Sequence, residues 1–446
     1  MSEDSQSSKN VASKYPQYIS ATIAGLSGFA SGIALCPLLL GSSYNENISF
    51  RLYETNNLQY LNIFGAVVGT LVSGFVSDSL GPKRAIQISA FPLFMSRLIT
   101  AYCRTVYGFY AAILLHGFAA GISLFSAINY SIDIAERRQR GSVAFMYYAL
   151  HFLGIICAHS IGRNVDDFIL QALIPSVVPV IYLTALSFIP ESPVHMCMNH
   201  DLPQACSSLQ WLRGADYDID DEIARIQEYT RSKNDHRRPT GANESVVRFA
   251  SRKTATLIFS ADSIFAVLYI LYARCFNCLD SLYLNMEFDI GWNSMTNELK
   301  LPLVLLLMWL VKHVELNILI PRVFVVNAIG VMTVEIVLYF FEDVEWLWIP
   351  CLLNVIISYG NVLLVTLLLW QVFDYIELKS KAIPFCLTMQ LGWIMMYTAM
   401  PEYDIPSIYF TIINIIVGFI DIQYFLPKLL KRKDMPTKTI FLQNVA

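Results

Sequence analysis

Acidic and basic side chains recur at short, regular spacings in the polar breaks between long apolar stretches of this sequence. Asp78 precedes Lys83 by five residues, and Asp133 precedes Arg140 by seven. At such spacings a carboxylate can pair with a cation or accept hydrogen bonds from the first amides of a neighbouring helix. Contacts of this kind can form in one conformation and be lost in another. These residues therefore predict a conformational gate.

The same charge pattern returns in the second half of the chain. Asn317 precedes Arg322 by five residues and Asp374 precedes Lys381 by seven, and these pairs follow their first-half counterparts by 239 and 241 residues. A near-constant offset across separate loops indicates an internal repeat. Two parallel repeats with matching polar turns are typical of transporters whose substrate site lies between the halves near mid-membrane.

These polar turns connect long apolar segments of the chain. Of the 446 residues, 55% are hydrophobic and 15% are charged, which predicts an integral membrane protein because a soluble domain needs a more polar surface. The predicted fold class is all-α, with twelve transmembrane helices in two six-helix pseudo-repeats, because a helix needs about 20 apolar residues to cross the bilayer. The predicted segments are residues 18–40, 58–77, 85–103, 107–132, 142–161, 168–189, 255–284, 299–316, 323–341, 346–373, 383–400 and 406–427.

Lys and Arg gather in the loops on one side of this arrangement, which the positive-inside rule places in the cytoplasm together with both termini. The sequon at Asn47 then faces outside and is a candidate for glycosylation. Two helical patterns, 202–214 and 220–231, fall in a central linker. The predicted organisation is a disordered cytoplasmic tail (1–17), a six-helix bundle (18–189), the cytoplasmic linker (190–253), a second bundle (254–427) and a second tail (428–446).

Several segments resemble signatures of the sugar porter family of the major facilitator superfamily. GFVSDSLGPKR (74–84) resembles the turn between the second and third helices, and DIAERRQRG (133–141) contains an acid seven residues before an Arg-Gly pair. PESP (190–193) resembles a family motif at the end of helix six, and WLRG (211–214) resembles one in the central loop. The sequences of these motifs most resemble those of insect facilitated trehalose transporter-like proteins. The resemblance implies the major facilitator fold and facilitative transport of a hexose or trehalose-like sugar by alternating access, with no enzymatic step and no cofactor.

The gate is expected to tie the two halves together on the cytoplasmic side. A glycine permits a turn that other residues resist, and small residues let helices approach closely. An alternative is that these residues only anchor helix ends among lipid headgroups. The predicted gating residues are Gly74, Asp78, Gly81, Lys83, Arg84, Asp133, Arg140, Arg322, Asp374 and Lys381.

The expected substrate site departs from the family pattern. Where the family has sugar-binding amides on helices five and seven, this sequence has Tyr148, Arg274 and Asp280. A charged Arg or Asp cannot both donate and accept hydrogen bonds as a neutral amide does. Aromatic rings could still stack on the apolar face of a sugar. The predicted substrate-binding residues are Tyr148, Arg274, Asn277, Asp280, Tyr283, Trp370 and Trp393.

Three functions stay open at this point: carriage of a sugar, carriage of a charged or zwitterionic organic solute that Arg274 and Asp280 would explain, and a sensor or scaffold that transports nothing. A proton relay could form among the other polar intramembrane residues, although lone histidines more often make packing hydrogen bonds. These residues are His116, His151, His159, Asp262, Glu335 and Asp421. The expected protein is a multi-pass, monomeric protein of the cell membrane. Its expected partners are a small solute and the lipid bilayer, and no metal, cofactor or nucleic acid is expected.

Overall fold

The computed structural model describes residues 14–35, 52–103, 105–136, 139–215, 217–237, 292–314 and 316–340, with isolated helical positions between 352 and 364 and at 415–416. Every regular element within these residues is helical. The chain divides into two compact units, residues 1–242 with 379–383, and residues 243–378 with 384–446.

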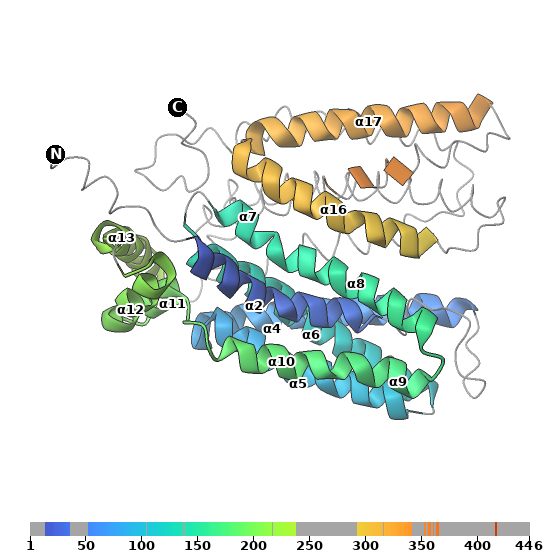
Figure 1. Ribbon diagram of the computed structural model, residues 1–446, viewed down its shortest axis with the longest axis horizontal. Coiled ribbons are helices and arrows are strands. Elements are labelled where there is room, and N and C mark those ends of the chain that lie inside the picture. Colours follow the sequence, from blue (N-terminus) through green and yellow to red (C-terminus); the bar gives the residue numbers. More distant parts are fainter. Residues whose placement is uncertain are drawn as a thin grey trace. The chain divides into compact units, whose positions relative to one another are not determined.

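The first unit contains a bundle of long apolar helices (Figure 1). Proline opens two of them, Pro16 in α2 and Pro82 in α5, where its missing N–H needs no helical partner. Thr105 and Asp167 cap α6 and α9 by accepting a hydrogen bond from a first-turn amide. The bundle helices are α2 (Tyr15–Ile33), α4 (Leu52–Leu80), α5 (Pro82–Tyr102), α6 (Val106–Ile134), α7 (Arg140–Ala144), α8 (Met146–Asn164), α9 (Phe168–Leu173), a 3-10 turn (Ile174–Ser176) and α10 (Val177–Leu186).

Four helical stretches in the described part of the chain are long and apolar enough to cross a membrane: Tyr60–Leu80, Val106–Ile134, Arg140–Asn164 and Phe168–Leu186. The third predicted segment contains Arg97, which is almost fully buried in α5. Its guanidinium donates to the carbonyl oxygen of Ala34 at the end of α2 and to Ser96 Oγ (3.0 Å). Burial of this charge among the helices is therefore accompanied by hydrogen bonds, as an intramembrane cation requires.

The helix boundaries differ from the predicted ones for local reasons. α2 begins at Tyr15, inside the predicted tail, and ends at Ile33, seven residues before the predicted limit of 40. Pro37 follows shortly, and the residue before a proline disfavours helix. The predicted segment 168–189 is divided by a 3-10 turn at Pro175. The segments at 255–284, 383–400 and most of 346–373 and 406–427 lie outside the described residues, so the total of twelve spans stays a prediction.

Glycines set the closest helix contacts of the bundle. A Cβ built on Gly65 or Gly69 of α4 would collide with backbone carbonyls of α6, and one built on Gly117 or Gly121 of α6 would collide with those of α4. The two glycines on each helix are four residues apart, the spacing that brings helix backbones together in membranes. This close approach was predicted for Gly74, which lies buried further along α4.

Two histidines connect the helices of this bundle by hydrogen bonds. His116 of α6 contacts Asn62 Oδ1 of α4 through Nδ1 (3.0 Å) and the carbonyl oxygen of Ser31 of α2 through Nε2 (3.1 Å). His151 of α8 contacts Ser31 Oγ through Nδ1 (3.0 Å). Both side chains thus link neighbouring helices, which is the packing role that intramembrane histidines commonly have.

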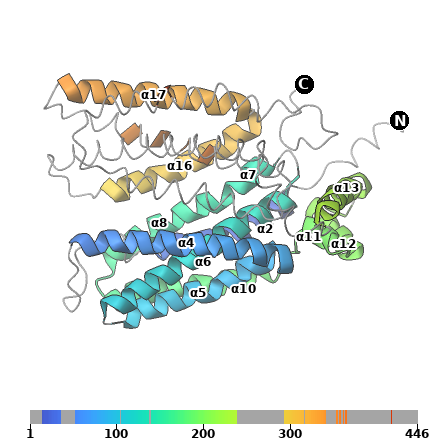
Figure 2. The same cartoon turned by 180° about the vertical axis from the view of Figure 1, so that it is seen from behind.

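Three shorter helices lie beyond one end of the bundle, and both views place them there (Figure 2). They are α11 (Pro193–Met198), α12 (Leu202–Arg213) and α13 (Asp220–Arg237). Cys197, Ala205, Leu209 and Ile223 form their shared core. α12 and α13 cover the two helical patterns predicted in the linker. α11 was not predicted, although Ser192 and Pro193 are typical residues for a helix start.

The second unit contributes α16 (Trp292–His313) and α17 (Leu316–Phe340) to the described residues. These helices contain the predicted segments 299–316 and 323–341 almost entirely and start seven residues before each of them. The early start of α16 places polar residues such as Asn293 and Asn297 in its first two turns.

Candidate transport gate

The turn between α4 and α5 has a backbone that only glycine adopts easily. Gly81 has φ of 100°, in the region that L side chains rarely enter. A Cβ at this position would lie 2.9 Å from the Glu191 carboxyl carbon and 2.9 Å from His195 Cδ2. The absence of a side chain at Gly81 therefore allows the segment that follows α10 to approach the start of α5.

Glu191 occupies the N-terminus of α5 from this segment. Its Oε1 accepts hydrogen bonds from Lys83 N (3.0 Å) and from Ser192 N (3.1 Å), while Lys83 Nζ donates to the carbonyl oxygen of Ile189 (2.7 Å). A carboxylate at a helix N-terminus is favoured by the exposed amides and the helix dipole. Burial raises the pKa of Glu191, and the two backbone hydrogen bonds and the Lys83 charge act in the opposite direction.

The end of α6 holds the same segment from a second side. Asp133 Oδ2 accepts a hydrogen bond from Ser192 Oγ (2.8 Å), and Tyr130 donates its hydroxyl hydrogen to the carbonyl oxygen of Pro190 (2.8 Å). Ser192 Oγ also accepts from His195 N (3.2 Å) and so caps α11. The residues 189–195 are thus fixed to both the α4–α5 turn and α6, and we call residues 189–195 the clasp.

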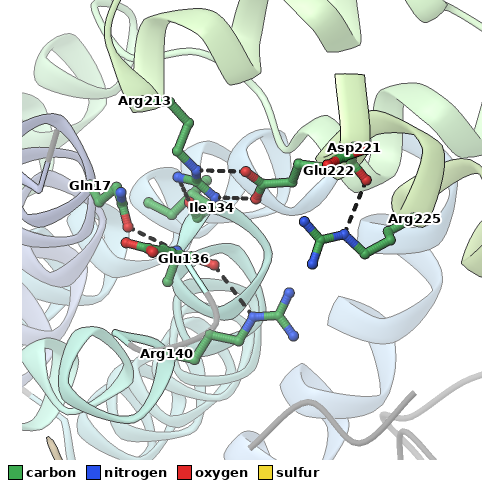
Figure 3. Close-up of polar contacts among 9 residues, drawn as sticks. Gln17, Ile134, Glu136, Arg140, Arg213, Asp221, Glu222 and Arg225 are labelled. Carbon is green, nitrogen blue, oxygen red and sulfur yellow. Dashed lines mark hydrogen bonds and ion pairs between the residues drawn. The ribbon is translucent and has the colours of Figure 1, made fainter. Parts of the chain in front are cut away.

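Arg213 fastens the small helices to the end of α6 (Figure 3). Its Nη1 donates to the carbonyl oxygen of Ile134 (2.9 Å), and its Nε and Nη2 form a two-pronged ion pair with Glu222 of α13 (3.0 and 2.6 Å). Arg213 is 1% exposed and Glu222 is 19% exposed. Since Ile134 follows Asp133, one helix end carries both the clasp contact and the Arg213 contact.

Arg140 lies on the other side of the same turn (Figure 3). Its Nε donates to the carbonyl oxygen of Ala135 (3.3 Å), and Glu136 N donates to Gln17 Oε1 of α2 (2.8 Å). Tyr18 of α2 donates to Gln139 Oε1 (2.9 Å). The loop between α6 and α7 is therefore tied to the start of α2 as well.

The other predicted gating residues are placed less centrally. Asp78 and Arg84 are exposed on either side of the Gly81 turn, Gly74 is buried in α4, and Arg322 is exposed on α17. Asp374 and Lys381 lie outside the described residues. Within one unit the structure thus brings together Gly81, Lys83 and Asp133 around the clasp. Their role as a gate between the halves stays a prediction.

Only one predicted substrate residue is described. Tyr148 of α8 is buried, and its ring contacts Tyr147 edge-on (centroids 5.7 Å apart) and Phe145 (6.3 Å). The remaining predicted substrate and modification residues lie outside the described residues: Asn47, Arg274, Asn277, Asp280, Tyr283, Trp370 and Trp393.

The residues that hold the clasp were largely missed at the sequence level. Glu191, Ser192 and Arg213 belong to the motifs PESP and WLRG, for which the sequence indicates only a resemblance to a family. An acid directly before a Ser-Pro pair, just beyond an apolar run, is a physical signal for a capped helix start. Nothing in the sequence indicated that Glu191 would reach Lys83, 108 residues away in the chain.

Comparison with solved structures defines the fold. The proton:xylose symporter XylE of the major facilitator superfamily, bound to 6-bromo-6-deoxy-D-glucose, matches with a TM-score of 0.72 at 16% identity, covering 93% of this chain and 95% of XylE. A partially occluded inward-open form of XylE from E. coli matches with a TM-score of 0.63 at 15% identity, and the match covers 93% of this chain and 99% of XylE. The chain therefore has the major facilitator fold.

Sequence comparison then gives the family. Residues 43–277, more than half of the chain, match the model of the family "Sugar (and other) transporter", and the chain belongs to that family. "Sugar transporter ERD6-like 6" of Arabidopsis thaliana is 28% identical over 219 residues, 49% of this chain and 43% of that protein. "Facilitated trehalose transporter Tret1" of Polypedilum vanderplanki is 25% identical over 217 residues, which are 48% of this chain and 43% of that protein. The matches span less than half the length of these two relatives.

Proposed function

We propose that this chain is a membrane carrier that moves a sugar by alternating access between two six-helix halves, with both termini in the cytoplasm. Membership of the sugar transporter family and the major facilitator fold support a transported sugar. A hexose and a trehalose-like disaccharide are the substrates suggested by relatives named as sugar and trehalose transporters. The cell membrane is the proposed location, and a monomer the proposed state.

The observation that carries the proposal is the clasp at the end of the first unit. Its contacts are hydrogen bonds between charged or polar groups, such as Ser192 Oγ to Asp133 and Lys83 N to Glu191. Bonds of this type can be exchanged for water at modest cost, because water offers the same donors and acceptors. A contact that opens at modest cost is what a gate requires, whereas a static scaffold would gain more from apolar packing.

A carrier of charged solutes is the second candidate. Arg274 and Asp280 stand where the family has neutral amides, and intramembrane charges are retained at substrate or ion pathways. A sensor or scaffold without transport is the third candidate. The intact clasp favours a chain that still changes conformation.

Uptake into transporter-deficient cells tests the proposal. Labelled glucose or trehalose should enter saturably with the wild-type chain, and Asp133→Ala should reduce the rate about tenfold or more, since a hydrogen bond to a charged group is lost. Asp167→Ala is the matched control, because Asp167 caps α9 at another point of the bundle and should keep near-wild-type uptake. A wild-type chain at the cell surface that moves neither sugar, or an Asp133→Ala chain as active as wild type, would refute the proposal.

A further inference from the structure

Two cysteines lie in the hairpin that α11 and α12 form. Cys197 is in the last turn of α11, and Cys206 is in the second turn of α12. Residues 199–201 connect the two helices, and Asp201 N donates a hydrogen bond to the carbonyl oxygen of Met196 (3.0 Å), which turns the chain back on itself. The two helices are therefore in contact along the hairpin.

The side chains of both cysteines belong to one cluster. Cys197 is 6% exposed and forms the core with Ala205, Leu209 and Ile223, and Cys206 packs against this core while it stays partly exposed. The pKa of Cys197 is raised to about 11, first by burial and second by the neighbouring Cys206. A like charge shifts a pKa in this way only when it is close. The two thiols are thus neighbours, and both are free.

The two thiols differ in the way that a redox pair requires. Cys206 is partly exposed, so a small oxidant reaches it first. Cys197 is buried and its raised pKa keeps it protonated, which makes it a poor first nucleophile but leaves it beside Cys206 as a resolving thiol. In the proposed orientation the hairpin faces the cytoplasm, where thiols are kept reduced and disulfides are usually transient and redox-sensing.

Both ends of this hairpin are fastened to the end of α6. Ser192, which caps α11, donates to Asp133, and Arg213, in the last turn of α12, donates to the carbonyl oxygen of Ile134. A covalent bond between α11 and α12 would join these two attachments. The open form of the clasp would then have less conformational freedom, because Arg213 would still hold the cross-linked hairpin near Asp133.

We propose that Cys197 and Cys206 form a redox switch, which hydrogen peroxide closes to a disulfide that holds the clasp shut. The Cys206 thiolate attacks one peroxide oxygen, the O–O bond breaks, and hydroxide leaves and takes up a proton to form water. The resulting Cys206 sulfenic acid is attacked by the Cys197 sulfur, which loses its proton, and the hydroxyl group leaves with that proton as a second water. The two thiols lose two electrons, and the peroxide gains them. Only the effect of the switch on uptake rests on the proposed transport function.

Peptide mapping of the purified protein after treatment with hydrogen peroxide tests the bond. Cleavage before Asp201, which lies between the two cysteines, should release two peptides joined by a disulfide that dithiothreitol reduces. Cys206→Ser should abolish the joined peptides. Cys197→Ala should stop the reaction at the Cys206 sulfenic acid, which dimedone labels. Cys103→Ser, at a free cysteine of the helix bundle, is the matched control and should leave the joined peptides unchanged.

Hydrogen exchange measures the clasp without any transport. Amides of residues 189–195 should exchange about threefold or more slowly in the oxidised protein than in the reduced protein, because exchange there requires the clasp to open. Peroxide should leave this exchange unchanged in Cys206→Ser. Uptake of labelled glucose or trehalose should fall by a similar factor on oxidation and recover with dithiothreitol.

Two results would overturn the switch. The first is the absence of the joined peptides after peroxide treatment, and the second is their presence with unchanged exchange of residues 189–195. Slower exchange with an unchanged rate of uptake would show that the switch does not control transport. Slower exchange in a chain that moves neither sugar, even when reduced, would refute the proposed function and leave the switch standing.

Discussion

Glu191 shows how one side chain can hold several parts of a membrane protein together. It reaches the start of α5 only because Gly81 has no side chain, and it accepts the Lys83 and Ser192 amides there. The contact combines a helix N-terminus, a carboxylate and a nearby ammonium group, which reinforce one another electrostatically. Burial opposes them, and its effect on the pKa of Glu191 is the largest.

This balance predicts a pH dependence of stability. The pKa of Glu191 is raised in the folded chain, so the native state holds its proton more tightly than the unfolded chain does. The free energy of unfolding should therefore fall as the pH rises from the ordinary glutamate range through the raised value. Glu191→Gln, which keeps an acceptor oxygen, should remove this part of the pH dependence in thermal unfolding of the purified protein.

Glu191→Ala supplies the contrast to that variant. It leaves the Lys83 amide without its acceptor and should cost about 1 to 3 kcal/mol at neutral pH. Equal stability of the alanine and glutamine variants would show that the hydrogen bonds of Glu191 contribute little. An unchanged pH profile in the glutamine variant would show that Glu191 does not titrate in the expected range.

Arg213 gives a second prediction with a control on a neighbouring helix. Arg213→Ala leaves Glu222 partly buried without its cation and should lower the free energy of unfolding by about 3 kcal/mol. Arg225→Ala should change it by less than about 0.5 kcal/mol, because Arg225 is exposed and donates to Asp221 of its own helix. Thermal unfolding in detergent, followed together with proteolysis of the 214–219 loop, measures both variants. Equal stability of the two would contradict the assigned role of Arg213.

The sequence predicted residues of this site unevenly. Gly81 could be anticipated, since a short polar turn between two helices often needs a backbone conformation that glycine adopts most easily. Asp133 was singled out for its spacing from Arg140, yet a hydrogen bond that the structure gives it comes from Ser192. Local spacing identifies candidate polar groups. The identity of a hydrogen-bond partner 59 residues away depends on how the helices pack.

At the scale of elements, the contact of α4 with α6 shows how glycines spaced four residues apart allow two helices to pack closely. Gly65 and Gly69 on one helix alternate with Gly117 and Gly121 on the other, and a Cβ at any of the four would collide with the backbone of the facing helix. The four-residue spacing was available in the sequence and would have identified this pair. The division of the predicted segment 168–189 was harder to foresee, because proline is often tolerated within membrane helices.

These glycines predict a difference between two identical substitutions. Gly121→Ala should destabilise the bundle by about 2 kcal/mol or more, because the methyl group meets the backbone at Ala66, which cannot move aside as a side chain can. Gly360→Ala should be neutral or stabilising, since its Cβ would make ordinary contacts with leucine side chains and alanine favours helix. The midpoint of thermal unfolding for each variant measures the difference. A Gly121→Ala chain as stable as the Gly360→Ala chain would contradict the close packing of α4 and α6.

For the molecule as a whole, composition, apolar segments and the repeated charge pattern were enough to predict a membrane protein of the major facilitator class. The fold comparison and the family match confirm that class. Substrate choice was beyond this reasoning, because it depends on a few side chains and the family amides are replaced at Arg274 and Asp280.

Counterflow in proteoliposomes tests the central claim most directly. A carrier that alternates access exchanges solutes one for one, so labelled glucose or trehalose should accumulate transiently above its equilibrium level in vesicles preloaded with an excess of the same unlabelled sugar. A channel or a scaffold cannot produce such an overshoot. We predict an overshoot that Asp133→Ala reduces about tenfold in initial rate. Folded, monodisperse protein that gives no overshoot with either sugar would contradict the account.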